Sequence, residues 1–160
     1  MIRNATYKDA AAIAEIYNYY VLNTVVTFEE APVSPDEMQR RITDVQIRFP
    51  WLVFEENGLI IGYAYAGPWK PRSAYRNSVE SSVYLQPTHI GKGIGRILYS
   101  KLINELRDLN IHAVIGGIAQ PNETSIKLHE NFGFKKIGLF SEVGWKLGRW
   151  VDVGYWELIF

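Results

Sequence analysis

The fold is decided by residues 78–109, which read SVESSVYLQPTHIGKGIGRILYSKLINELRDL. The beginning of this stretch alternates in character, with Val79, Val83 and Leu85 on one face of an extended strand. Pro87 ends the strand, alternating glycines follow, and apolar residues then recur three or four apart, as in an amphipathic helix. The stretch therefore predicts a strand, a glycine-rich turn and a long helix in direct succession.

The flanking sequence continues this alternation of helices and strands. Helices are predicted at residues 9–22, 35–48, 94–109 and 122–132. Strands are predicted at residues 51–54, 59–67, 78–86 and 113–118, with a final antiparallel pair over 138–160. Ser34 is a candidate N-cap, and Asn57-Gly58 is typical of a hairpin turn. No repeat or linker interrupts the chain, so residues 1–160 are predicted to form a single α/β (α+β) domain with a mixed sheet.

Composition limits the class of protein. The 160 residues carry 17 Lys and Arg against 17 Asp and Glu, and this zero balance argues against a sequence-independent nucleic-acid binder. The absence of cysteine excludes a disulfide scaffold, a thiolate metal site and a cysteine nucleophile, and it fits a reducing compartment. No apolar run approaches the roughly 18 to 20 residues that span a bilayer, and the N-terminus lacks the features of a signal peptide. We expect a soluble, cytoplasmic protein that binds neither nucleic acid nor membrane.

The glycine-rich turn Gly91-Lys92-Gly93-Ile94-Gly95-Arg96 is the first candidate ligand site. The first N–H groups of a helix have no intrahelical partner and lie at the positive end of its dipole, which suits a phosphate. The turn is not a Walker A loop, because Lys92 precedes a glycine, and Arg96 breaks the Rossmann fingerprint. On the glycines alone, a phosphate site and a plain strand-to-helix turn both stay open.

Further candidates come from the strand before this turn and from the last helix. Glu80 shares its strand face with Ser82 and Tyr84, where a carboxylate can act as a general base or simply face solvent. His129 follows Asn122 by two helical turns and could move a proton near neutral pH, although a structural role explains it equally well. Asn122 itself has the position of an N-cap. The three histidines lack the spacing of metal ligands, so no metal site is predicted.

Two arginines precede the Glu80 strand. Arg72 and Arg76 could hold a small anion such as a carboxylate, since guanidinium groups bind carboxylates in a bidentate manner. Ordinary surface charge is the alternative.

In this order, the motifs resemble the GCN5-related N-acetyltransferase (GNAT) superfamily. The resemblance is carried by residues 83–85, 91–96, 122 and 128–134, and it covers nearly the whole chain. Residues 72–76, 79–85 and 144–153 further resemble the phosphinothricin and methionine sulfoximine N-acetyltransferase subgroup. The resemblance implies a mixed, largely antiparallel sheet of about seven strands flanked by about four helices, with a splayed strand pair where acyl-CoA binds.

The resemblance also implies roles for individual residues. Glu80 would be the base, directly or through water, and His129 stands where many relatives carry a tyrosine that protonates the leaving thiolate. Acetyl-CoA, as a co-substrate and without a metal, would be bound by Val83, Tyr84, Leu85, Gly91, Lys92, Gly93, Ile94, Gly95, Arg96, Asn122 and Asn131. The acceptor would be bound by Phe28, Glu29, Arg72, Ser73, Ala74 and Ser82. Ile90 departs from the superfamily's usual Gln or Arg, which leaves the backbone donors unchanged.

The implied reaction is direct transfer of an acetyl group to the α-amine of a small amino-acid analogue of the phosphinothricin, methionine sulfoximine or methionine sulfone type, with detoxification or resistance as its use. Arg72 and Arg76 favour an acceptor that carries an anionic group. Two alternatives stay open: an acetyltransferase for another amine (a protein N-terminus, lysine, polyamine or aminoglycoside), and a non-catalytic acyl-CoA sensor.

The resemblance further implies a homodimer. The aromatic tail, which includes Trp145 and Trp150, would then be either core or subunit interface. The sequence leaves open whether Lys146 and Trp150 reach the partner's active site.

Overall fold

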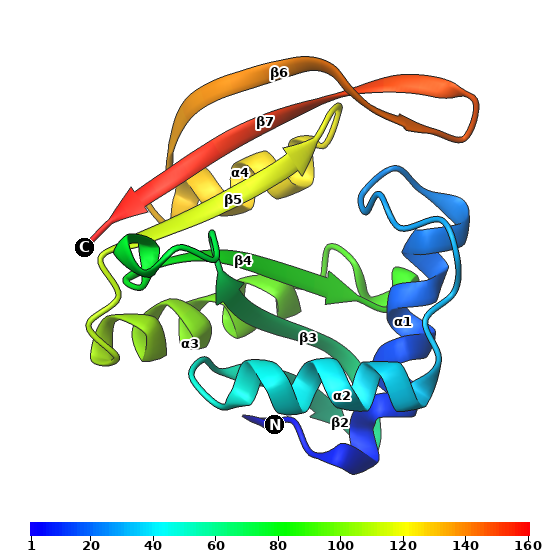
Figure 1. The fold of residues 1–160 in the computed structure, drawn as a ribbon. Coiled ribbons are helices and arrows are strands. Elements are labelled where there is room, and N and C mark those ends of the chain that lie inside the picture. The colour runs from blue at the N-terminus through cyan, green and yellow to red at the C-terminus, as the bar shows by residue number, and fades with distance from the viewer.

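The computed structural model describes residues 1–160 as a twisted seven-stranded sheet with helices on both faces (Figure 1). The strands are β1 (Ile2–Asn4), β2 (Trp51–Glu56), β3 (Leu59–Pro68), β4 (Ser78–Leu85), β5 (Ala113–Ala119), β6 (Lys135–Lys146) and β7 (Arg149–Ile159). The helices are α1 (Ala10–Asn23), α2 (Pro35–Gln46), α3 (Ile94–Asp108) and α4 (Glu123–Asn131). The strand order is β1-β2-β3-β4-β5-β7-β6, and only the β4–β5 pair is parallel. The predicted mixed, largely antiparallel sheet is confirmed.

The element boundaries differ from the predictions by a few residues. The second helix ends at Gln46 rather than residue 48, and the final strand pair begins at Lys135 rather than residue 138. Strand β1 was not predicted, because three residues are too short for a period-two pattern. The predicted cap is present: the Ser34 hydroxyl accepts a hydrogen bond from the Glu37 N–H at 3.2 Å.

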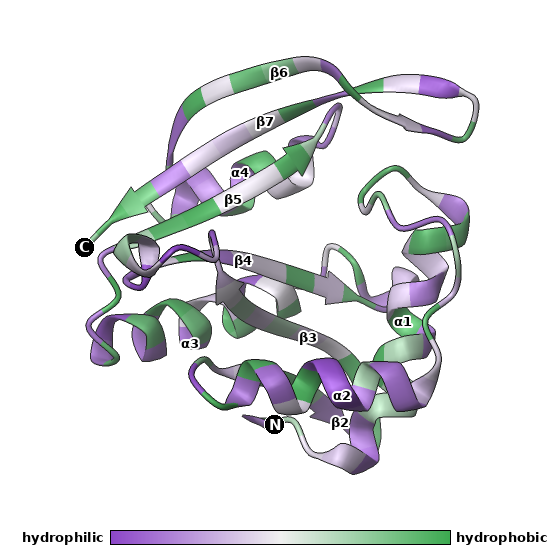
Figure 2. Ribbon diagram, viewed as in Figure 1, coloured by the Kyte–Doolittle hydropathy of each residue, from purple (hydrophilic) through white to green (hydrophobic).

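The core consists of two layers, one on each face of the sheet. Along β2, Trp51 and Val53 pack with α1 and α2, whereas Leu52 packs with α3 on the opposite face. This alternation is the period-two pattern of a strand that is buried on both sides. Figure 2 shows the corresponding apolar segments of β5 and α3 in green.

Strands β4 and β5 pair over only three positions and then diverge. Ser78, Val79 and Glu80 lie opposite Ala113, Val114 and Ile115, and no pairing follows. From Ser81 onward β4 therefore has a paired edge on the side of β3 and a free edge on the side of β5. We call this divergence the strand fork. The predicted splayed pair is present, and it opens directly beyond Glu80.

The β6–β7 hairpin extends beyond the rest of the sheet and reaches across to the loop between α1 and α2 (Figure 1). Strand β6 is the outer edge, and it is largely exposed along its length. Figure 2 shows that this exposed edge nevertheless carries several apolar segments. No helix of the protein has the length and apolar character that crossing a membrane requires.

Candidate active site

Two adjoining cavities lie at the strand fork. The fork cavity, about 50 Å³, is lined by Val26, Ser81, Ser82, Val83, Tyr84, Gly117, Ile118, Ala119, Asn122, Ser125 and His129. The outer cavity, about 290 Å³, is lined by Val26, Phe28, Glu80, Gly117, Ala119, Val143, Val153 and Tyr155. Val26, Gly117 and Ala119 belong to both linings, so one group of residues separates the two spaces. A molecule in each cavity would meet its neighbour across these three residues.

Size does not identify this site. A larger groove of about 670 Å³ lies between the ends of α2 and α3, with Arg48 and Leu109 in its lining. None of the candidate residues contributes to it. The fork is the stronger candidate because it gathers the titratable groups and free backbone donors described below.

Glu80 is the last residue of β4 that pairs with β5, and it lines the outer cavity. Its side chain is half-buried and makes no hydrogen bond or ion pair within the chain. Burial raises the pKa of Glu80 above the usual glutamate value, and the charge of Lys70 opposes part of this shift. A carboxylate with free lone pairs and a raised pKa is suited to accept a proton.

His129 is 5% exposed and lies beneath the fork cavity. Its Nδ1 lies 2.7 Å from the Ser125 carbonyl oxygen, which can only accept, so Nδ1 carries a proton. In the neutral ring, Nε2 then carries a lone pair and no proton, and this atom is buried without a hydrogen-bond partner. Burial also lowers the pKa of His129, so the neutral form predominates at neutral pH. His129 therefore lines the cavity with a ring whose Nε2, buried against Gly116, is an acceptor, and it holds a donatable Nε2 proton only when it is cationic.

Two consecutive glycines in β5 give these two side chains their space. A Cβ on Gly116 would lie 2.5 Å from His129 Nε2, and a Cβ on Gly117 would lie 3.0 Å from Glu80 Oε1. Neighbouring residues of a strand face opposite sides, so each glycine serves one candidate side chain. The sequence analysis did not single out Gly116-Gly117. A glycine pair inside an apolar strand was the available signal.

The glycine-rich turn at the start of α3 is a set of free backbone donors. None of the N–H groups from Gly91 to Arg96 finds an acceptor within the chain. Gly91 and Gly93 have φ angles of 83° and 81°, a left-handed conformation that glycine adopts without strain. Together with the free edge of β4, these donors fit an extended ligand that ends in a pyrophosphate.

The other predicted acetyl-CoA residues divide into two groups. Val83 and Tyr84 line the fork cavity, and Leu85 ends the same free edge. Asn122 also lines this cavity and caps α4, because its Oδ1 accepts a hydrogen bond from the Ser125 N–H at 3.1 Å. Asn131, by contrast, is exposed at the end of α4 and lines neither cavity.

The predicted acceptor residues are also dispersed. Phe28 lines the outer cavity and Ser82 the fork cavity. Glu29 instead forms an ion pair with Arg41 at 2.6 Å. Residues 72–74 are exposed around a short 3-10 turn and contribute to neither lining. The structure does not bring these three residues to the cavity walls.

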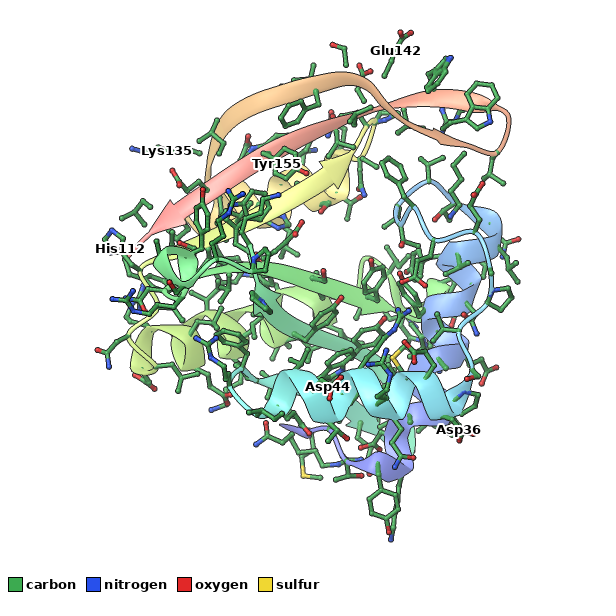
Figure 3. All side chains as sticks on the ribbon, viewed as in Figure 1. Asp36, Asp44, His112, Lys135, Glu142 and Tyr155 are labelled. Carbon is green, nitrogen blue, oxygen red and sulfur yellow. The ribbon has the colours of Figure 1, made fainter.

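Several residues of the outer cavity were missed by the sequence analysis. Val26 comes from the loop after α1, Val143 from β6, and Val153 and Tyr155 from β7 (Figure 3 labels Tyr155). Tyr155 lies opposite Gly117 in the sheet, and its pKa is raised by burial and by the charge of Glu80. No local motif marks these positions, since they meet only when the strands pair. The structure gathers no group of three or more His, Cys, Asp or Glu side chains that could hold a metal ion.

Comparison with known proteins gives concordant results. The sequence profile of the acetyltransferase (GNAT) domain matches residues 2–154. The chain is 40% identical to phosphinothricin N-acetyltransferase of Streptomyces viridochromogenes, over 98% of this chain and 85% of that protein. It is 42% identical to the L-methionine sulfoximine/L-methionine sulfone acetyltransferase of Salmonella typhimurium, over 98% and 92%. The crystal structure of a GNAT superfamily phosphinothricin acetyltransferase from Sinorhizobium meliloti in complex with AcCoA superimposes with a TM-score of 0.97 at 40% identity, covering 100% of this chain and 88% of that one.

Proposed function

Because the chain belongs to the GNAT acetyltransferase family, we propose that it transfers the acetyl group of acetyl-CoA directly to the α-amine of a small amino-acid analogue. The acceptors are of the phosphinothricin, methionine sulfoximine and methionine sulfone type, as the names of its relatives state for those proteins. The observation that carries the proposal is the position of Glu80. Its unpartnered carboxylate lies in the wall of the outer cavity, on the strand whose free edge and following turn could hold the acyl donor.

The acyl donor is held mainly by backbone groups. The free N–H groups of residues 91–96 would bind the pyrophosphate, and the free edge of β4 would pair with the pantetheine arm as a further strand would. In this arrangement the thioester end would lie toward the fork cavity. Side chains such as Lys92 and Arg96 are exposed and would add charge at the phosphates.

Glu80 serves as the general base. An amino-acid amine is largely protonated at neutral pH, so it must lose a proton before its nitrogen can attack the thioester carbonyl. Glu80 faces the outer cavity, where the amine would lie, and it accepts this proton directly or through a water molecule. General base catalysis of this kind contributes typically about a hundred- to ten-thousand-fold to the rate.

His129 serves as a proton relay. In the neutral ring Nε2 carries a lone pair. His129 therefore first takes the second proton from the attacking nitrogen and then donates that proton to the departing thiolate. The products are the acetylated amine and CoA thiol, and the proton on Glu80 is released to solvent. The chain contains no cysteine, so transfer does not pass through an acyl-cysteine intermediate.

The acceptor's anionic group would lie near the cationic loop after β3. Lys70, Arg72 and Arg76 belong to this loop, and Lys70 is close enough to Glu80 to influence its pKa. Residues 72–74 would contribute only if the loop moves toward the outer cavity when the acceptor binds. Detoxification of such analogues in the cytoplasm, where acetyl-CoA is available, belongs to the same proposal.

The proposal includes a homodimer built on strand β6. This edge exposes the large apolar side chains of Ile137, Leu139, Phe140, Val143 and Trp145, and the hairpin adds Leu147 and Trp150. Exposed apolar surface of this extent is typical of protein interfaces. Sedimentation of the protein at micromolar concentration tests this part. A monomer would refute it.

Thiol release from acetyl-CoA across a panel of amines tests the proposed reaction. The panel contains phosphinothricin, methionine sulfoximine, methionine sulfone, ordinary amino acids, a polyamine, an aminoglycoside and an N-terminal peptide. We expect turnover with the amino-acid analogues and none with the polycations. Turnover confined to a peptide or polycation would refute the acceptor class, and acetyl-CoA binding without turnover on any amine would favour a sensor.

A further inference from the structure

We infer that Lys146 is a positioning residue for the acceptor, and that it acts by holding residues 24–30 in place as a wall of the outer cavity. The inference deepens the proposed function and rests on it for the identity of the ligand. It also bears on the open question of whether Lys146 reaches a partner subunit, because its ammonium group is already engaged within its own chain.

Lys146 is buried although it takes part in no ion pair. Its side chain lies at the end of β6 and is 2% exposed. Its Nζ donates a hydrogen bond to the Thr27 carbonyl oxygen at 2.7 Å and lies 3.5 Å from the Tyr20 carbonyl oxygen. Burying an ammonium group is unfavourable unless it is paired, and a core position of this kind is normally apolar. A role in packing alone does not require a lysine here.

Lys146 holds the carbonyl oxygen of Thr27, which lies between two residues that line the outer cavity. Val26 and Phe28 both line the outer cavity, and Thr27 separates them. The Thr27 hydroxyl is also bonded, at 2.7 Å, to the hydroxyl of Tyr17 in α1. Thr27 is therefore fixed from the helix side through its side chain and from the hairpin side through its carbonyl group.

Apolar contacts support the same junction between the loop and the hairpin but leave its position less well defined. Phe28 covers Gly144 so closely that any side chain at that position would overlap its ring. Val25 packs with Val151 and Ala119 in a small separate cluster. Apolar contacts are non-directional, whereas a hydrogen bond to a single carbonyl oxygen fixes one position along the loop.

Loss of the Lys146 hydrogen bond would leave the Thr27 carbonyl group without its partner. A partly buried carbonyl group without a partner tends to move toward water, and residues 26 and 28 would move with it. The acceptor would then lose part of its binding wall. The free edge of β4 and the turn at residues 91–96 do not contact Lys146. The one link is Tyr20, whose hydroxyl donates to the Leu85 carbonyl oxygen. Its own carbonyl group keeps the hydrogen bond from Thr24, so the edge and the turn should be unaffected.

The test compares Lys146→Met with Lys135→Met. Methionine keeps the length of the side chain but has no donor, and Lys135 is an exposed lysine on the same strand that points away from the sheet (Figure 3). Steady-state kinetics give the KM of each substrate. Hydrogen–deuterium exchange measures the opening of residues 24–30 without any need for turnover.

For Lys146→Met we expect the acceptor KM to rise at least tenfold, the acetyl-CoA KM to stay within twofold, and exchange at residues 24–30 to increase. Lys135→Met should resemble the unsubstituted protein in all three. Unchanged exchange at residues 24–30, or an equal rise of both KM values, would overturn the inference. If the unsubstituted protein turns over none of the amines, the proposed function fails, and the exchange measurement still decides whether Lys146 holds the loop.

Discussion

The two cavities at the strand fork are built in different ways. The fork cavity and its approach come from β4, the turn after it, the end of β5 and the start of α4, and the groups offered to a ligand are largely backbone N–H and C=O groups. The outer cavity is lined by side chains from the α1–α2 loop, β4, β5, β6 and β7. We call the fork cavity, the free edge of β4 and the turn at residues 91–96 the donor side, because acetyl-CoA would bind there, and the outer cavity the acceptor side. Because the two sides are built differently, each can be disturbed separately. Side-chain substitutions should affect the acceptor side, and only backbone changes should seriously affect the donor side.

Replacing the base should have the largest effect, and it should leave the donor side intact. For Glu80→Gln we expect kcat to fall by about a hundred- to ten-thousand-fold, because glutamine cannot accept the amine proton. Acetyl-CoA affinity, measured by calorimetry, should change less than twofold, since Glu80 lines only the outer cavity. Strongly weakened acetyl-CoA binding would contradict the separation of the two cavities.

The pH profile sharpens the same test. Glu80 works as a base only when it is ionised, so the rate should fall as the pH drops through its pKa. Burial raises this pKa above the usual value, so the fall should begin at a higher pH than for an exposed glutamate. In Glu80→Gln the part of this acid limb that titrates with Glu80 should be absent, which leaves only the fall that accompanies protonation of His129 at lower pH. An identical limb in both proteins would assign it to another group.

The same difference explains what the sequence could predict. The donor side follows from one continuous stretch, in which alternation, Pro87, the glycines and a helical period each report a local conformation. Glu80 was singled out as a candidate for the same reason, because it lies on that strand. The predicted order of elements, the fork and the turn were accordingly confirmed by the structure.

The acceptor side could not be predicted in this way. Val26, Val143, Val153 and Tyr155 approach one another only through the pairing of β5 with β7 and through the reach of the β6–β7 hairpin. Sequence spacing carries no information on such contacts between distant segments. The tautomer of His129 was equally inaccessible, because it depends on the carbonyl group that its Nδ1 contacts.

The glycine pair in β5 offers a second test, in which neighbouring substitutions should affect opposite sides. In Gly117→Ala the new Cβ would displace Glu80, and in Gly116→Ala it would displace His129. A misplacement of about 1 Å can reduce the rate by about a hundredfold. We expect the acceptor KM to rise only for Gly117→Ala, and thiol release in a single turnover to slow in both.

Gly138→Ala is the matched control for this pair, because a Cβ there meets no atom within 4 Å. It should leave the acceptor KM and the single-turnover rate of thiol release unchanged. Equal kinetic defects in Gly116→Ala and Gly117→Ala, with a matching loss of stability, would mean that β5 is simply distorted.

The turn before α3 should respond to backbone strain with a smaller effect. Gly93 has a φ angle of 81°, and alanine in a left-handed conformation costs about 1 to 2 kcal/mol. If the turn relaxes to relieve this strain, acetyl-CoA affinity should fall by about tenfold. Gly58→Ala, with φ of 79° in the β2–β3 turn, imposes the same strain at a remote site and should lower stability without affecting either substrate.

Removing one hydroxyl from the outer cavity should have the smallest effect and should be the most selective. Tyr155 lines that cavity and is near enough to Glu80 for the carboxylate charge to raise its pKa. Its hydroxyl can donate a hydrogen bond to the acceptor or to the base, and a neutral hydrogen bond contributes about 0.5 to 1.5 kcal/mol. For Tyr155→Phe we therefore expect the acceptor KM to rise by about two- to twelvefold, with acetyl-CoA KM unchanged.

Tyr7→Phe is the control for Tyr155→Phe, since Tyr7 is 65% exposed and lies outside both linings. If Tyr155→Phe instead lowers kcat as strongly as Glu80→Gln, the hydroxyl handles the transferred proton, and the base is a Glu80–Tyr155 pair. If acetyl-CoA binding weakens, the two cavities are not independent, because Gly117 would transmit the change from β7 across β5. A selective change in acceptor KM leaves the simplest account in place: the backbone binds the donor, and side chains from distant segments select the acceptor.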